Sequence, residues 1–152
     1  MKTFLIILIF LTTFLGCARN NAFESFGFTP EQELSEIYTR SSKIKKDDSV
    51  DGIVSVVYLN KIYPNVYKDA EYFYVNVYRK EKLHPINFEL NALKPSKTET
   101  LQAVNEFSRL IPSNSSWKEH YMIVFEEQGD ILSLVVKSGL FGSDELLYEK
   151  DE

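Results

Sequence analysis

The chain has 152 residues, of which 17 are Lys or Arg and 22 are Asp or Glu, so its formal net charge is -5. This length fits one domain. A hydrophobic content of 44% with 14% aromatic residues is too high for a disordered chain. This diffuse acidic balance argues against nucleic-acid binding, which needs clustered Lys and Arg to displace counterions. The composition therefore indicates one folded domain without a nucleic-acid partner.

The first 16 residues have the pattern of a secretory leader. Lys2 precedes an apolar run from residue 4 to residue 15, and Gly16 follows the run. Twelve helical residues reach only about 18 Å, well short of the roughly 30 Å hydrocarbon layer of a bilayer. A positive start, a short apolar run and small residues after it are typical of a signal peptide. We therefore expect residues 1–16 to be a leader.

Cys17 is the only cysteine of the chain and follows this run directly. A single cysteine cannot form an internal disulfide, so its thiol is available for other chemistry. The sequence Phe14-Leu15-Gly16-Cys17 resembles the lipobox of bacterial lipoproteins, in which a small residue precedes the cysteine that is lipidated and becomes the mature N-terminus. Gly16 and Cys17 match that pattern. Phe14 and Leu15 depart from it, because the family usually has Leu at the first position and a smaller residue at the second.

This resemblance covers residues 1–17 alone and implies a lipid anchor at Cys17, with palmitate-type acyl chains and attachment to the cell envelope. Two or three acyl chains, at about 0.8 kcal/mol per buried methylene, hold a protein stably on a bilayer. In similar lipoproteins of two-membrane bacteria, a residue such as Ala18 after the cysteine accompanies sorting to the outer membrane, facing the periplasm. Two other interpretations stay open: cleavage after Ala18 that releases a free protein, and an uncleaved membrane anchor.

The rest of the chain divides into a short tether and one domain. Residues 17–28 show no sustained periodicity, so we interpret them as the lipidated N-terminus and a tether. We expect residues 29–152 to form a single domain. Its first element is a helix from Pro30 to about residue 40, because Thr29 begins a capping box and proline suits the first helical position.

The segments after residue 50 alternate or run apolar in the manner of β-strands. They are 50–59, 70–80, 85–93, 120–126, 130–138 and 145–149. Gln128-Gly129 between two alternating runs predicts a hairpin. Residues 96–111 return to helical spacing after a capping box that begins at Ser96, so we expect a crossover helix there.

These elements indicate a mainly β fold. Six or so antiparallel strands without a βαβ rhythm favour a two-layer β-sandwich of the immunoglobulin or fibronectin kind, with an N-terminal helix and one short crossover helix. The alternative is a single curved sheet with helices on one face.

Six tyrosines lie between residues 58 and 78. Three of them, Tyr72, Tyr74 and Tyr78, would share one face of a strand, opposite the apolar face that begins with Phe73. Exposed rings of this kind can bind a sugar or a protein partner, so these three form a candidate binding face. Tyrosine also packs well along a sheet, and this structural interpretation is the favoured one. Trp117 is expected to plug the core.

No motif for catalysis or metal binding is complete. Asp47 and Asp51 match the first and fifth positions of an EF-hand calcium loop, but Tyr58 stands where the closing carboxylate is needed. The two histidines, His84 and His120, lack the spacing of a zinc site. Neither a nucleophile elbow nor a phosphate-binding glycine loop is present. We therefore expect no catalytic residues, no metal and no cofactor.

These observations predict a lipid-anchored cell-envelope protein of a non-catalytic binding or assembly type. Its partners would be a membrane, through the anchor at Cys17, and an envelope protein or glycan. The alternative is a glycan-binding or hydrolytic domain. A deep pocket lined by carboxylates or histidine would favour the alternative, and a flat tyrosine face would favour a protein-binding module.

The lipid anchor has a direct test at Cys17. In the native cell, the mature protein should carry diacylglycerol and fatty acid on this residue and should incorporate labelled palmitate. The Cys17→Ala variant should lose the label, because no other thiol is available. Mass measurement of the mature N-terminus checks the prediction, and an unmodified start or a chain still beginning at Met1 would contradict it.

Overall fold

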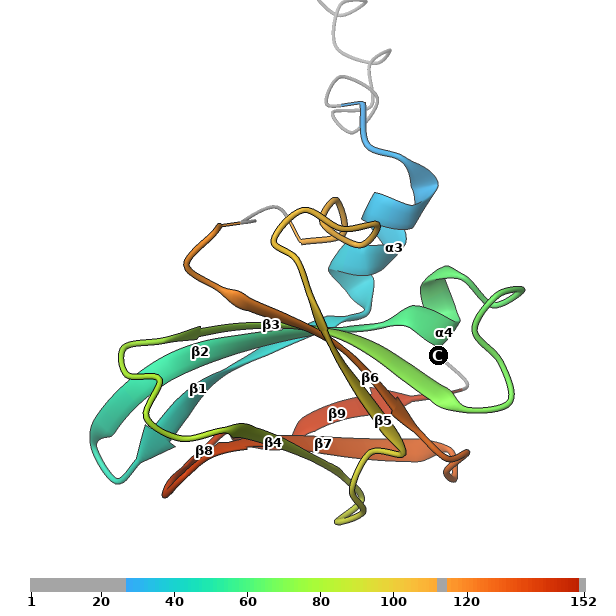
Figure 1. The fold of residues 1–152 in the computed structure, drawn as a ribbon. Coiled ribbons are helices and arrows are strands. Elements are labelled where there is room, and N and C mark those ends of the chain that lie inside the picture. Colours follow the sequence, from blue (N-terminus) through green and yellow to red (C-terminus); the bar gives the residue numbers. More distant parts are fainter. Residues whose placement is uncertain (1–26, 112–114, 151–152) are drawn as a thin grey trace, which may run out of the picture.

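The computed structural model describes residues 27–111 and 115–150, so the leader, Cys17 and most of the tether lie outside the described residues. In this part of the chain the fold is mainly β, and nine strands form one antiparallel sheet that curls on itself (Figure 1). The strands are β1 (Thr39–Lys46), β2 (Ser49–Tyr58), β3 (Glu71–Arg79), β4 (Ile86–Leu90), β5 (Lys97–Leu101), β6 (Glu119–Phe125), β7 (Ile131–Ser138), β8 (Phe141–Gly142) and β9 (Leu146–Glu149). The described helices are α3 (Pro30–Ile37) and α4 (Leu59–Ile62). Neither helix is long and apolar enough to cross a bilayer.

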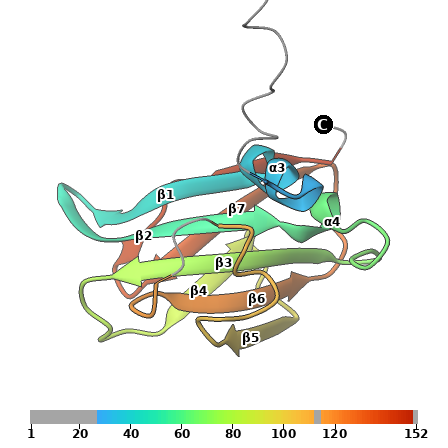
Figure 2. The same cartoon turned by 90° about the horizontal axis from the view of Figure 1, so that it is seen from above.

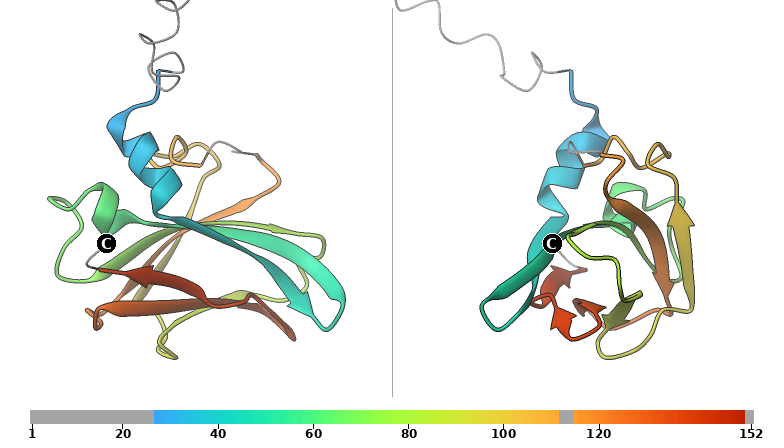
Figure 3. Two further views of the ribbon diagram at one scale, coloured as in Figure 1. Left: turned by 180° about the vertical axis from the view of Figure 1, so that it is seen from behind. Right: turned by 60° about the vertical axis from the view of Figure 1, so that its left-hand side comes forward.

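The strands follow the order β4-β7-β8-β1-β2-β3-β6-β5, and β9 pairs with β7. The curl carries β7 and β9 beneath β2 and β3, and the end view shows the chain surrounding a common interior (Figures 1 and 3). Both layers therefore belong to one continuous sheet, whereas an immunoglobulin-like sandwich has two separate sheets. The alternative prediction, a curved sheet with helices on one face, describes the arrangement better, because α3 and α4 lie on the same outer side (Figure 2).

Apolar side chains from both layers fill the interior of the curl. On β3 the side chains of Phe73, Val75 and Val77 point inward, in the alternation that the sequence predicts. Leu132 and Leu134 of β7 meet them from the opposite layer. The rest of this inner core consists of Ile44, Val54, Val56, Tyr58, Phe88, Leu90, Ile123, Phe125, Val136, Leu146 and Tyr148.

A second apolar cluster lies on the outer face of the sheet. Val57 of β2 and Tyr74 of β3 are fully buried there, and Leu34 of α3 and Phe107 pack against them. The end of β2 is therefore covered on both faces. α3 begins with a capping box between Thr29 and Gln32 and ends at Ile37, because β1 starts two residues later.

The crossover helix predicted for residues 96–111 is wrong. The first part of this segment is β5, and the remainder forms turns. Ser96 does not cap a helix, because its amide and hydroxyl groups both donate to the carbonyl oxygen of Val124 on β6 (2.8 and 3.1 Å). Phe107 still reaches the outer cluster, whereas Val104 is 85% exposed. Pairing with a neighbouring strand has overridden a local helical pattern.

The hairpin predicted around Gln128-Gly129 is also wrong. β6 pairs with β3 and β5, whereas β7 pairs with β4, β8 and β9. Residues 126–130 instead carry the chain from one layer to the other (Figure 1). Ile123 of β6 and Leu134 of β7 both belong to the inner core. The two strands therefore face each other across the interior through their side chains and are not paired through their backbones.

A buried carboxylate holds this corner in place. Glu71, at the start of β3, is 1% exposed. Its Oε1 accepts hydrogen bonds from Lys150 Nζ (2.6 Å) and from the amide of Gln128 (2.9 Å), and its Oε2 accepts one from the Tyr58 hydroxyl (2.7 Å). Burial and the neighbouring Glu71 carboxylate raise the pKa of Tyr58, so this phenol stays protonated and donates. One side chain thus joins β2, β3, the corner and the end of β9.

Replacing Glu71 should be far more costly than replacing an exposed carboxylate. Glu71→Ala should lower the free energy of unfolding by about 3–5 kcal/mol, because it leaves the Lys150 ammonium without its buried partner. Glu99→Ala is the control, since the Lys97–Glu99 pair is exposed and such pairs contribute about 1 kcal/mol or less. Urea denaturation of both variants checks the difference, and equal losses would contradict the assignment.

Candidate functional site

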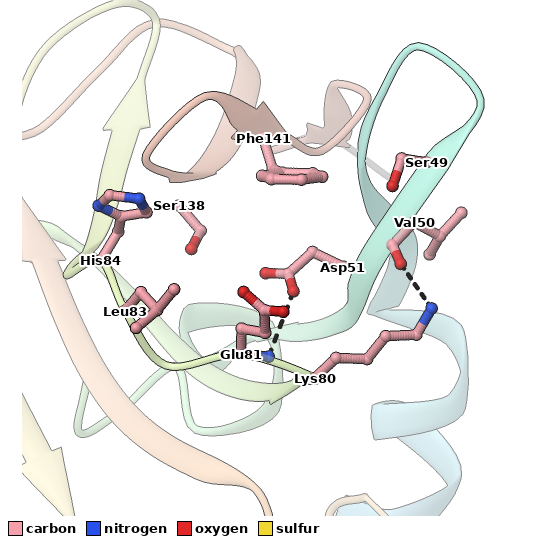
Figure 4. A pocket seen from close by; sticks show the side chains of 9 residues that line it. All are labelled: Ser49, Val50, Asp51, Lys80, Glu81, Leu83, His84, Ser138 and Phe141. Carbon is pink, nitrogen blue, oxygen red and sulfur yellow. Dashed lines mark hydrogen bonds between the residues drawn. The ribbon is translucent and has the colours of Figure 1, made fainter.

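A cavity of about 200 Å³ opens where the start of β2, the segment after β3 and the end of β7 meet (Figure 4). Its polar lining includes Asp51, Glu81, His84 and Ser138, and its aromatic lining is Phe141. In the sequence, Asp51 belongs only to an incomplete calcium motif, and His84 has no histidine at the spacing of a zinc site. The fold brings these distant residues to one cavity.

Close approach of β2 and β3 places Asp51 at the cavity. A Cβ atom on Gly52 would lie 2.1 Å from the carbonyl oxygen of Tyr78, so only glycine allows the two backbones this proximity. The chain then turns around Asp51, because its backbone oxygen accepts from the amide of Lys80 (2.8 Å) and its Oδ1 accepts from the amide of Glu81 (3.3 Å).

Two carboxylates make the cavity acidic. Asp51 is 8% exposed, and it lines the cavity together with Glu81 (Figure 4). Lys80 does not neutralise them, because its ammonium group points away and donates to the carbonyl oxygen of Val50 (2.8 Å). Within residues 27–111 and 115–150, neither carboxylate forms an ion pair.

A buried arginine, Arg79, holds part of the cavity lining in place. Arg79 is 6% exposed, and its Nε and Nη2 both donate to Oε2 of Glu119 (3.1 and 2.7 Å). Its Nη1 donates to the Ser138 hydroxyl (3.0 Å) and to the carbonyl oxygen of His84. Because Glu119 takes up the arginine charge, Arg79 positions two lining residues without neutralising the acidic cavity.

The His84 ring packs against the backbone of Gly139. This glycine has a φ of +58°, and a Cβ atom there would lie 2.6 Å from Cδ2 of His84. Glycine therefore supplies both the backbone conformation and the space for the ring. In the described part of the chain, no hydrogen bond joins the His84 ring to Ser138 or Asp51. Ser138 and His84 therefore lack the hydrogen bond that joins the nucleophile and the base in a serine hydrolase.

The candidate tyrosine face needs correction. Tyr74 is fully buried beneath the outer cluster, so it cannot belong to an exposed binding face. Tyr72 is half-buried and packs against Tyr67, with 4.9 Å between the ring centroids. Tyr78 is 40% exposed. The three rings therefore do not form one continuous exposed surface.

Two other sequence predictions can be placed. Trp117 is 74% exposed, so the prediction that it plugs the core is wrong. Asp47 has a φ of +51° in the turn between β1 and β2, which accounts for the acidic residues there without a metal. No group of three or more potential metal ligands lies together in the part of the chain that the structure describes. Cys17 lies outside that part.

A polar row, buried at Asn76 and His120, crosses the outer face of the sheet and was not predicted. Ser41, Ser55, Asn76 and His120 occupy paired positions on β1, β2, β3 and β6. His120 is 1% exposed, and its Nδ1 is hydrogen-bonded to the Tyr74 hydroxyl (2.9 Å). Among the described atoms, both amide atoms of Asn76 and Nε2 of His120 lack a hydrogen-bond partner.

The chain matches no protein-family model, and comparisons with curated proteins and with solved structures gave no match.

Burial of His120 should make stability depend on pH. Burial lowers the pKa of His120 below its ordinary value of 6.5, and the nearby Lys118 charge also lowers it, while the Ser115 backbone acts in the opposite direction. As pH falls below 6.5, the unfolded chain binds a proton before the folded chain does. The free energy of unfolding should therefore fall by up to about 1.4 kcal/mol per pH unit in that range.

Denaturation of the wild type and of His120→Gln at a series of pH values checks this expectation. The variant should lack the part of the slope that begins near pH 6.5, because glutamine does not titrate. Identical pH profiles for the two proteins would rule out His120 as the source.

Proposed function

We propose that this chain is a lipid-anchored protein of the bacterial cell envelope and that its domain is a non-catalytic binding module for one saccharide unit of an envelope glycan. The anchor rests on the lipobox-like sequence that ends at Cys17, and in a two-membrane bacterium the domain would face the periplasm from the outer membrane. The glycan assignment rests on one observation, the acidic cavity between Asp51, Glu81 and Phe141.

The chemistry of the cavity favours a ligand rich in hydrogen-bond donors. Carboxylates accept hydrogen bonds from sugar hydroxyl groups, and charge-assisted hydrogen bonds of this kind are stronger than neutral ones. The Phe141 ring lies across the cavity from Asp51 and offers a flat apolar surface to the C–H face of a sugar (Figure 4). The hydroxyl groups of the exposed Ser49 and the buried Ser138 add further polar groups to the lining.

The size of the cavity favours one unit of a larger ligand. Pockets for drug-sized molecules measure roughly 300–1,000 Å³, whereas this cavity holds about 200 Å³. A single sugar ring would enter, and the rest of the glycan would remain outside. Binding is proposed in preference to hydrolysis, because the His84 ring has no hydrogen bond to Ser138 or Asp51 among the described residues.

The position of the cavity is compatible with anchoring. α3, which follows the tether, packs near the end of β2, whereas the cavity lies at the start of the same strand. A domain held through its N-terminus therefore keeps the cavity accessible. Tethering raises the effective concentration of such a module near glycans at the same membrane, so even a weak single-unit site would be useful.

Titration with an N-acetylglucosamine tetramer tests the proposal. The wild-type protein should give saturable NMR shifts at Asp51, Glu81 and Phe141. Asp51→Asn should weaken binding about 10- to 100-fold, because it replaces a charged acceptor with a neutral amide. Asp144→Asn, at an exposed carboxylate that pairs with Lys45, is the matched control and should bind as the wild type does.

Two outcomes would contradict the proposed glycan site. One is the absence of saturable shifts at the cavity, and the other is equal affinity in Asp51→Asn and the wild type. Neither outcome bears on the anchor, which the Cys17 experiment tests separately.

A further inference from the structure

The two end strands of the sheet each have one unpaired edge. Among the strands of residues 27–111 and 115–150, β4 pairs only with β7, and β5 pairs only with β6. The curl brings both strands to the same side of the molecule, where residues 91–96 join them (Figures 1 and 3). The sheet therefore stops short of closing into a barrel, and its seam lies between β4 and β5.

Hydrogen bonds at the end of β4 reveal which backbone groups face this seam. The amide of Asn91 donates to Ser133 on the β7 side, whereas Leu90 exchanges both of its backbone hydrogen bonds with Leu93 on the other side. Successive residues of an antiparallel strand alternate in this respect. Ile86 and Phe88, which share the phase of Leu90, therefore direct their N–H and C=O groups toward the seam.

A groove of about 480 Å³ runs along these groups. Its walls come from residues 86–89 of β4 and from Thr98 of β5, with Lys94 and Pro95 at one end. Phe88 is 3% exposed, belongs to the inner core and contacts the half-buried Tyr121 with a ring-centroid distance of 5.3 Å. The groove thus combines backbone donors and acceptors that face the seam with buried apolar side chains on its inner side.

The charges along the seam distinguish the two edges. β5 carries an exposed ion pair, Lys97–Glu99, on its own strand, and charged side chains of this kind discourage pairing at an edge. On β4 the only charged residue, Glu89, is tied to Lys137 of β7 (2.6 Å). Lys94 forms no ion pair among the described residues, so the groove presents one unneutralised cation to an occupant.

We propose that the free edge of β4 is a docking site for an extended acidic peptide segment of a partner protein, which adds to the sheet as a strand. Backbone hydrogen bonds to Ile86 and Phe88 hold the segment, as in other cases of strand addition. Alternate side chains of the added strand face the same side of the sheet as the buried Phe88 and are apolar. An acidic side chain pairs with Lys94. This inference does not depend on the glycan site.

Synthetic peptides test this docking site on the full-length lipidated protein in detergent micelles. The probe is a short peptide in which Val alternates with Thr and one Thr is replaced by Glu at each position in turn. Its control is the same peptide with backbone amides methylated, which removes the donors that a strand needs. Binding is measured by fluorescence anisotropy, and protection by hydrogen exchange.

At least one peptide of the set should bind, and its methylated copy should not. Ile86 and Phe88 should exchange their amide hydrogens rapidly in the free protein and at least about tenfold more slowly in the complex. Lys94→Glu should weaken binding of the Glu-containing peptide by about fivefold or more, within the usual range for a charge reversal at an interface. Lys43→Glu, at an exposed lysine of β1, should leave binding unchanged.

Ile86→Pro removes one seam-facing amide without removing a hydrogen bond to β7, so it should abolish binding, whereas Ile86→Val should retain it. If Ile86→Pro fails to fold, the Lys94 comparison and the methylated peptide still decide. The proposal is overturned if no peptide binds, if the methylated copy binds equally well, or if protection appears away from β4.

Discussion

Two opposite buried charges at the ends of β3 hold the curl together. Every second residue of β3 faces the interior, and this row begins with Glu71 and ends with Arg79. Glu71 bonds to Lys150 beyond β9, and Arg79 bonds to Ser138 at the end of β7. The same strand is thus attached at both ends to the opposite layer. Buried ion pairs often add little net stability compared with apolar residues, so their clearest effect here is to fix which strand ends meet across the interior.

The candidate cavity follows from one of these attachments. Arg79 pairs in register with Gly52, and this close pairing sets Asp51 beside the turn after β3. Arg79 also holds Ser138 and the backbone of His84. Its guanidinium group is paired with Glu119 and not with a carboxylate of the cavity. The acidic cavity therefore lies next to a buried arginine that is already paired with Glu119.

Local alternation in the sequence predicts strands well, but not how the strands are paired. The inward-facing residues of β3 can be recognised in the sequence by their alternation. Glu71 and Arg79 fall at the same alternate positions, which indicates that both are buried, although their charge alone would suggest exposure. The segment 96–111 has helical spacing, yet β6 supplies hydrogen bonds to its first part. Asp51 and His84 meet only because β2 pairs with β3 and Gly139 makes room for a ring. Such contacts depend on tertiary structure, which periodicity does not encode.

The interior of the curl is packed with apolar side chains, so both proposed binding sites lie where the sheet stops. The acidic cavity lies at the ends of β2, β3 and β7, and the groove lies along the free edge of β4. The two are neighbours: His84 and Ser138 line the cavity, whereas Ile86 and Gly139 line the groove. The His84 ring rests on Gly139, so this contact forms part of the wall between them. A strand added beside β4 would therefore end next to the cavity.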